Sequence, residues 1–371
     1  MKHLQNPLIS PVLGTHRVID SFHFGTPGTG KKIYIQASLH ADELPGMLAA
    51  WKLKKQLLTL EAQGHIKGEV VLVPMANPIG QNQHLMDVHL GRYETETGQN
   101  FNRGYFDTFE DVVVLVENKL SNDKEKNKSL IRAALRESIL NWQVDTEIHS
   151  QQKILQTLSC DADIIIDMHC DFEAVQHTYC THYSWDSIAP LAQYLKSEAN
   201  MLADETGGKP FDSSFDLVWQ RLQTRFGDIV PKACQAVTLE LCGQADVYHG
   251  KSNEDAKALI NYLRHLNVVT DQPADVLTTE AAPATDLEAV EPLKSKIGGV
   301  LVLCADVGVK VTTGQLIAEV IDPITDEVQQ IRASQPGLLF SRSSRRTATA
   351  GMLVAHVAGK KNIRSGYLLA P

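Results

Sequence analysis

The fold is decided by one stretch of sequence, Ile33-Tyr34-Ile35-Gln36-Ala37-Ser38-Leu39-His40-Ala41-Asp42-Glu43. Its apolar first part predicts a buried strand over 33–39, and the Pro45-Gly46 that follows opens a helical pattern reaching about residue 62. His40 and Glu43 would then lie on the loop at the carboxyl end of a strand, where open α/β sheets bind ligands. Such a pair can hold one divalent metal, although H-x-x-E also occurs by chance or on a solvated helix face.

Length and charge exclude several classes of protein. The 371 residues are enough for one large domain or for two. The 35 Lys and Arg residues against 44 Asp and Glu residues give a formal charge of -9, which argues against nucleic acid or an anionic membrane as a partner. No apolar run is long enough for a membrane span, and the N-terminus is a poor signal peptide.

The six cysteines indicate the compartment. None belongs to a C-x-x-C pair and most lie in apolar runs, so we interpret them as free, reduced thiols. The sequence therefore predicts a cytoplasmic protein.

The order of elements predicts a parallel α/β sheet. A second strand at 70–74 follows the helix, and strand, helix, strand is the βαβ unit. Residues 1–30 look loop-rich with short β-like pieces, and 107–160 look helical around a solvated loop at 121–127. The pattern Ser252-x-x-Asp255 predicts the start of a later helix.

A second histidine ends a second buried strand, Asp163-Ile164-Ile165-Ile166-Asp167-Met168-His169. A lone buried histidine is more often a satisfied core residue than a ligand. Here the sheet would bring it to the same edge as His40, and Asp167 or Asp171 could accept its other ring N–H.

A glutamate ends a third buried strand at 236–243. A carboxylate is costly to bury without a partner or a function, so Glu240 is either half of a structural ion pair or a reactive group. The stretch 80–104 is polar and punctuated by glycine, which is typical of either a disordered segment or a functional loop. It carries Arg92, Asn102 and Arg103.

The composition changes near residue 270. Residues 1–270 would form a catalytic domain, and 271–292, rich in Pro, Ala, Thr and acidic residues, a linker or crossover. Residues 293–371 lack a helical period and predict a small all-β domain. It resembles a biotinyl or lipoyl carrier, but the hairpin that would present a modifiable lysine reads Asp322-Pro323-Ile324-Thr325-Asp326, so the swinging-arm function is excluded. We expect this domain instead to border the mouth of the active site or to form an oligomer contact.

The assembled residues resemble the zinc carboxypeptidase superfamily and, more closely, the succinylglutamate desuccinylase/aspartoacylase family. Two histidines and a carboxylate are the hydrolytic zinc set, with a second glutamate left as base. The resemblance covers roughly residues 30–265. It rests on the H-x-x-E of His40 and Glu43, the D-x-H ending in His169, the Asn102-Arg103 pair and Glu240.

This resemblance implies an α/β fold in three layers, a carboxypeptidase-like mixed sheet flanked by helices, with a small C-terminal all-β domain. It also implies one Zn²⁺ per chain, bound by His40, Glu43 and His169. Another divalent metal is not excluded, because ligand type discriminates poorly.

The family's catalytic residues carry over by the same resemblance. Glu240 would be the base and then the proton donor, and Asn102 and Arg103 would hold a substrate carboxylate. Arg92 falls where the family polarises the scissile carbonyl, although an ordinary surface arginine is the alternative.

The predicted function is a zinc-dependent hydrolase that cleaves the amide bond of a small N-acyl amino acid or a related acylated amine. A peptidase or esterase using the same metal, and a non-catalytic metal-binding module, are the alternatives. The partner would be a small carboxylate-bearing molecule, and a homo-oligomer is left open.

Overall fold

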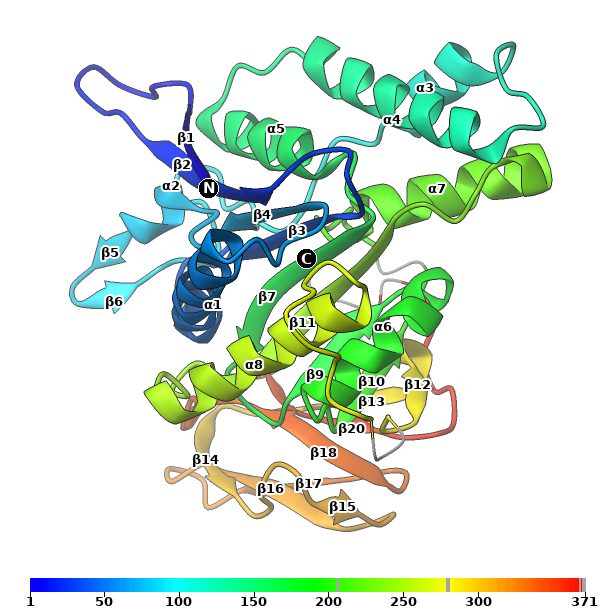
Figure 1. Ribbon diagram of the computed structural model, residues 1–371. Coiled ribbons are helices and arrows are strands. Elements are labelled where there is room, and N and C mark those ends of the chain that lie inside the picture. The colour runs from blue at the N-terminus through cyan, green and yellow to red at the C-terminus, as the bar shows by residue number, and fades with distance from the viewer. Residues whose placement is uncertain (205–206, 278–280, 367, 369–371) are drawn as a thin grey trace.

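A mixed nine-stranded sheet lies at the centre of the computed structural model, which describes residues 1–204, 207–277, 281–366 and 368 (Figure 1). In spatial order its strands are β1 (Lys2–Pro7), β2 (Val18–Gly25), β4 (Glu69–Val73), β3 (Lys32–Ala37), β7 (Ile164–Asp171), β11 (Gln235–Gly243), β9 (His177–Cys180), β10 (Ala199–Leu202) and β12 (Ala284–Asp286). The middle strands β4, β3, β7 and β11 are mutually parallel.

Helices cover both faces of this sheet, so the predicted three-layer α/β fold is confirmed. One face packs against α1 (Leu44–Ala62), α6 (His182–Tyr194) and α8 (His249–His265). The other packs against α3 (Phe109–Val116), α4 (Lys124–Asn141), α5 (Glu147–Ser159) and α7 (Ser213–Phe226). The short α2 (Pro78–Gln81), the 3-10 turns η1 (Gly227–Ile229) and η2 (Leu287–Ala289), and the hairpin of β5 (His84–Leu85) and β6 (Val88–His89) complete this part.

The C-terminal strands form two antiparallel sheets, as predicted for an all-β region. One contains β13 (Val290–Lys294), β20 (Leu353–Ala358), β18 (Gly337–Arg342) and β15 (Lys310–Val311). The other contains β17 (Val328–Arg332), β16 (Leu316–Ile321), β14 (Gly299–Leu303) and β19 (Thr347–Ala348). The hairpin without lysine is present between β16 and β17.

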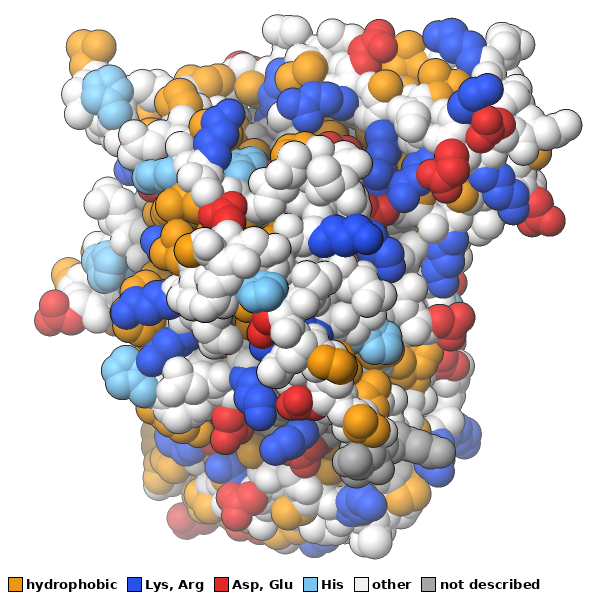
Figure 2. All heavy atoms as spheres, viewed as in Figure 1, with side chains coloured by type: hydrophobic (Ala, Val, Ile, Leu, Met, Phe, Trp, Pro, Cys, Tyr) orange, Lys and Arg blue, Asp and Glu red, His pale blue; other side chains and the backbone are white. Residues whose placement is uncertain are grey.

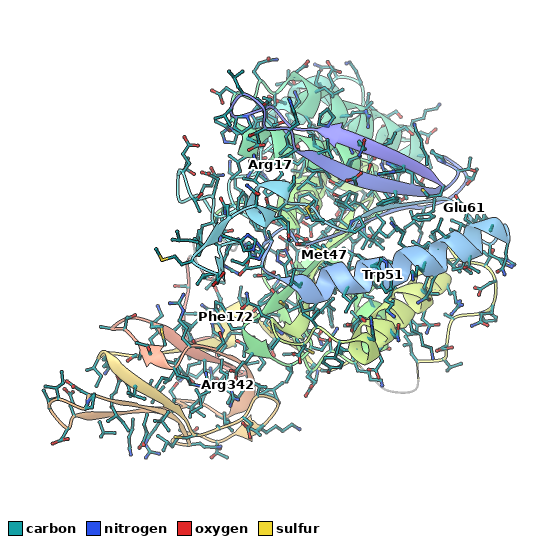
Figure 3. The ribbon with its side chains drawn as sticks, turned by 90° about the vertical axis from the view of Figure 1, so that its left-hand side faces the viewer. Arg17, Met47, Trp51, Glu61, Phe172 and Arg342 are labelled. Carbon is teal, nitrogen blue, oxygen red and sulfur yellow. The ribbon has the colours of Figure 1, made fainter. Side chains whose placement is uncertain are left out.

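Two contacts join this region to the central sheet. The strand β8 (Glu173–Ala174) follows β7 and pairs with β18, and Arg342 Nε donates to Glu173 Oε2 at 2.7 Å. Figure 3 shows Phe172 and Arg342 at this junction. Within the predicted linker 271–292, β12 pairs with β10 and so extends the central sheet; residues 278–280 lie outside the described residues. The domain boundaries themselves stay a prediction.

Residues 1–30 contain the short strands β1 and β2 between loops, and the two strands pair antiparallel and extend the sheet beyond β4. One local prediction was wrong. The last helix begins at His249, and Ser252 lies inside it, where its Oγ donates to the Tyr248 carbonyl. A serine hydroxyl that bonds four residues back within a helix can satisfy itself without capping the helix.

Candidate metal centre

Strand register brings the predicted residues together. In parallel pairing, Gln36 of β3 lies opposite Asp167 of β7, and His169 of β7 lies opposite Glu240 of β11. Because side chains alternate along a strand, Asp167 and His169 share a face, and Glu240 joins them on it. His40 arrives from the loop directly after β3.

The loop after β3 is held by a close backbone contact. The Ala41 N–H donates to the Gly91 carbonyl at 2.9 Å, and a Cβ at Gly91 would collide with the backbone of Asp42. Because Gly91 has no side chain, the two loops can approach each other closely; any side chain at this position would push them apart. The contact places Arg92 beside the loop that carries His40 and Glu43.

His40, Glu43 and His169 form a compact buried cluster. His40 Nδ1 lies 2.9 Å from Glu43 Oε1, and His169 Nδ1 lies 2.8 Å from Glu43 Oε2. One ligand atom from each residue falls within 4.8 Å of the others, and all three residues are buried. In the described part of the chain, this is the one group of three such side chains able to hold a metal ion.

The outer ring nitrogens explain why Nδ1 faces inward in both histidines. His40 Nε2 lies 2.9 Å from Asn100 Oδ1, an acceptor, so the ring proton belongs on Nε2. His169 Nε2 lies 2.9 Å from Asp167 Oδ2. With protons on both Nε2 atoms, two lone pairs and a carboxylate point at one centre, as a divalent metal requires. The cluster therefore fits a single metal site.

The pKa values show how tightly these charges interact. Burial alone would raise the pKa of Glu43, but the charges of His40 and His169 and their hydrogen bonds outweigh it and hold that pKa well below its usual range. Burial alone would lower the pKa of His169, but Asp167 and Glu43 together raise it well above the ordinary value. Burial, with a further contribution from Arg92, lowers the pKa of His40. Glu43 is thus held as the carboxylate.

Glu240 lies in the same cavity with unused hydrogen-bonding capacity. Its Oε2 atom is buried and has no hydrogen-bond partner. Burial first, and then the nearby charge of Glu43, raise the pKa of Glu240 to about 8. A buried carboxylate oxygen without a partner is costly, so an ion pair that serves only stability does not explain it.

The polar loop supplies three cavity residues in different settings. Arg92 Nη1 donates to Glu43 Oε1 at 3.0 Å, so Arg92 is no isolated surface arginine. Asn102 is buried, and its Oδ1 accepts the Phe211 N–H at 2.8 Å. Arg103 Nη1 donates to the Asn102 carbonyl at 2.7 Å, and burial lowers the pKa of Arg103. All three line the cavity that contains the metal cluster.

The C-terminal region contributes to the wall of this cavity, which is about 350 Å³ in volume, in agreement with the expectation that the β domain borders the mouth of the site. Its lining includes Tyr179 and Asp212 as well as residues from the C-terminal region: Leu287, Val290, Arg345, Leu353, His356, Arg364 and Leu368. No sequence motif marks any of these residues, and those of the C-terminal region reach the cavity only because the C-terminal sheet docks there. Asn100 was also missed as a site residue, although it lies in the polar loop that was singled out.

The protein has a central mixed sheet with helices on both faces, and a buried His-Glu-His cluster near the strand ends that is consistent with a single metal site. The family described as "Succinylglutamate desuccinylase/Aspartoacylase catalytic domain" matches residues 29–266. The chain belongs to this family, as the sequence motifs predicted. Its members are usually metal-dependent deacylases, and zinc is their typical metal.

Solved structures share the fold over nearly the whole chain. A succinylglutamate desuccinylase/aspartoacylase family protein from Shewanella amazonensis is 23% identical, with a TM-score of 0.85 over 96% of this chain and 98% of that one. A similar protein from Shewanella frigidimarina is 23% identical, with a TM-score of 0.84 over 96% and 97%.

The ectoine utilization protein EutE (DoeB) from Ruegeria pomeroyi, in its product-bound structure, is 17% identical, with a TM-score of 0.68 over 97% of this chain and 95% of that one. At such identities these likenesses establish the fold alone. No curated protein matches the chain.

Two surface features bear on partners. In the described part of the chain, no helix is long and apolar enough to cross a membrane. On the face in Figure 2, Lys and Arg side chains are interspersed with Asp and Glu, and the described residues there show no extended patch of one sign.

Proposed function

We propose that the protein is a zinc-dependent deacylase that hydrolyses the amide bond of a small N-acyl amino acid or a related acylated amine. The observation that carries the proposal is the partnerless Oε2 of Glu240, which shares one cavity with the His40, Glu43 and His169 cluster. A module that only binds metal has no need of a half-buried carboxylate beside it. Hydrolysis needs such a base.

His40, Glu43 and His169 are the residues that would hold the metal. His40 and His169 present Nδ1, while Asn100 and Asp167 hold the opposite sides of their rings. A Zn²⁺ ion in this cluster would supply a Lewis acid for the carbonyl and make an attacking water more acidic.

Glu240 moves the proton in this proposal. Its carboxylate accepts a proton from the attacking water and returns it to the nitrogen of the leaving amine. Its raised pKa suits the second half of this task, because the protonated acid must survive long enough to donate. The first half needs the ionised carboxylate, which a nearby positive metal charge favours.

The loop residues bind and polarise the substrate. Arg103 can grip a carboxylate with two parallel N–H groups, and the Nδ2 amide of Asn102 is a suitable second donor. Arg92 is held beside Glu43 through one Nη1–H, and its other N–H groups can donate to the carbonyl oxygen that becomes negative during attack.

The substrate class is supported by the cavity. Its volume of about 350 Å³ suits a small molecule better than a folded chain. The six free thiols favour a reducing, cytoplasmic compartment as the place of this reaction.

A substrate panel tests the proposal. The zinc-loaded protein should release free acid from N-acyl amino acids, and release less from short peptides and from acyl esters. Hydrolysis of peptides alone would assign the site to a peptidase, hydrolysis of esters alone to an esterase, and hydrolysis of none of them to a binding module. Each of those three results contradicts the proposal.

A further inference from the structure

A chain of buried polar side chains leads away from His169 along the sheet. The Tyr34 hydroxyl donates to Gln36 Oε1 at 2.9 Å, and Gln36 Nε2 donates to Asp167 Oδ1 at 2.9 Å. The other Asp167 oxygen lies 2.9 Å from His169 Nε2. Tyr34, Gln36 and Asp167 have no measurable exposure to solvent. Polar groups this deep are costly unless they act together.

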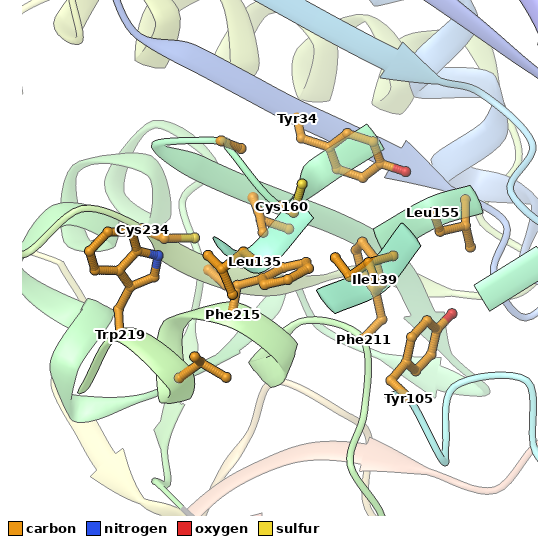
Figure 4. Close-up of a cluster of buried hydrophobic side chains, with 14 of the residues drawn as sticks. Tyr34, Tyr105, Leu135, Ile139, Leu155, Cys160, Phe211, Phe215, Trp219 and Cys234 are labelled. Carbon is orange, nitrogen blue, oxygen red and sulfur yellow. The ribbon is translucent and has the colours of Figure 1, made fainter. Parts of the chain in front are cut away.

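These hydrogen-bonded polar side chains lie in apolar surroundings. Tyr34 belongs to the apolar cluster between the sheet and α3, α4, α5 and α7, and its ring lies 5.8 Å from that of Phe211. Figure 4 shows Tyr34, Tyr105 and Phe211 toward one end of the cluster and Trp219 and Cys234 at the other. Apolar residues at 34 and 36 would suit this face for packing alone.

The direction of the hydrogen bonds is fixed. Tyr34 donates to the amide oxygen, which leaves the amide nitrogen of Gln36 to donate to Asp167. Asp167 Oδ1 is thereby occupied, and Oδ2 is the oxygen that faces His169. Neither Oδ2 nor His169 Nε2 makes a hydrogen bond within the described residues, so each atom has only the other as a near polar neighbour. The pair is close but not well aligned for a hydrogen bond, so small movements of the carboxylate matter.

We propose that Gln36 and Tyr34 are positioning residues for the metal site. They act through Asp167: they fix its carboxylate so that His169 carries its ring proton on Nε2 and directs Nδ1 at the metal. Residues behind a metal-bound histidine are known to affect metal affinity by orienting the ring. The proposal concerns metal binding alone, so it stands or fails independently of the substrate.

The first experiment measures the Zn²⁺ dissociation constant by competition with a chelator at fixed pH. Gln36→Leu keeps the size of the side chain but removes both hydrogen bonds, and should weaken zinc binding about 10- to 100-fold. Tyr34→Phe removes a single oxygen and should weaken it about two- to tenfold, as expected for one hydrogen bond.

Thr178→Val is the matched control. Thr178 is equally buried in the central sheet, and its Oγ1 donates to Asn200 Oδ1 at 2.8 Å. It pairs with Leu239 of β11 and is not among the residues that line the cavity of the metal cluster. It should bind zinc as the unmodified protein does. If its affinity fell as far as that of Gln36→Leu, the effect would be one of general stability and the proposal would be wrong.

The double variant tests whether Tyr34 acts on Asp167 through Gln36. If Tyr34 acts through Gln36, adding Tyr34→Phe to Gln36→Leu should change the zinc dissociation constant by less than about twofold. The visible spectrum of bound Co²⁺ should shift in the single variants and stay unchanged in Thr178→Val. Should Gln36→Leu fail to fold, Tyr34→Phe against Thr178→Val decides the question. Unchanged zinc affinity and an unchanged Co²⁺ spectrum in folded Tyr34→Phe and Gln36→Leu would overturn the proposal.

Discussion

The two faces of the central sheet bury different kinds of side chain, although the same strands build both. Toward α1 and α8, β3 and β7 present aliphatic residues such as Ile33, Ile35 and Ile166. Toward α3, α5 and α7, the alternate positions include Gln36 and Asp167. Both faces bury an apolar cluster that stabilises the sheet, but the face toward α3, α5 and α7 also buries polar groups, which in our proposal position the metal site. Substitutions on the two faces should therefore fail in different ways.

The largest effect is expected at Glu240. Glu240→Gln keeps the shape but cannot accept a proton, so turnover should fall about 10²- to 10⁴-fold while zinc stays bound. Steady-state kinetics together with metal analysis measure both. Normal turnover would refute the role as base, and loss of zinc would instead make Glu240 a ligand.

Substitutions on the face toward α1 and α8 should lower the stability of the fold and leave zinc binding unchanged. Ile166 of β7 is fully buried against the α1 and α8 side, and Ile166→Ala should lower the free energy of unfolding by about 2–5 kcal/mol. The folded variant should keep its zinc affinity. Urea unfolding of the metal-free protein and zinc competition test the two halves, and a zinc affinity that falls as in Gln36→Leu would erase the distinction between the faces.

Arg103 should affect one kind of substrate. Arg103→Ala removes a charge-assisted hydrogen bond worth about 1.5–3 kcal/mol, so kcat/KM for an N-acyl amino acid should fall at least about tenfold, mainly through KM. The matching amide, which lacks the carboxylate, should already be poor and lose little more. Equal losses for acid and amide would show that Arg103 does not bind the carboxylate.

The last expected effect concerns the pH dependence of stability in the metal-free protein, without substrate or turnover. The pKa of Glu240 rises from 4.5 to about 8 on folding, so between these values the folded state holds a proton that the unfolded state releases. The stabilisation is complete below the unfolded pKa and is lost as pH rises through the folded pKa. Glu240→Gln should therefore gain stability relative to the unmodified protein between about pH 5 and 8, by at most about 1.4 kcal/mol per pH unit. Parallel urea titrations measure this, and a difference independent of pH would contradict it.

Much of the fold and the metal cluster could be predicted, because both follow from local pattern. Short apolar runs ending in His169 or Glu240 identify strands and place their last side chains at one sheet edge. The H-x-x-E of His40 and Glu43 follows another such strand.

What escaped prediction depends on contacts between distant residues. Nothing near Asn100 indicates that its amide meets His40, sixty positions earlier. The pairing of β1 with β2 requires a partner strand, and Arg345 and Arg364 reach the cavity only because the C-terminal sheet docks there. Gln36 was quoted within its strand, but its bond to Asp167 appears only when β3 and β7 lie side by side.

The most direct test of the account follows zinc and hydrolysis together. The protein is stripped with a chelator, zinc is added back, and the release of acid from an N-acyl amino acid is measured at each step. We predict that activity disappears with the metal and returns in proportion to zinc up to one ion per chain, and that His169→Ala recovers neither. Hydrolysis that persists without metal, or full zinc occupancy with unchanged affinity in His169→Ala, would contradict the account.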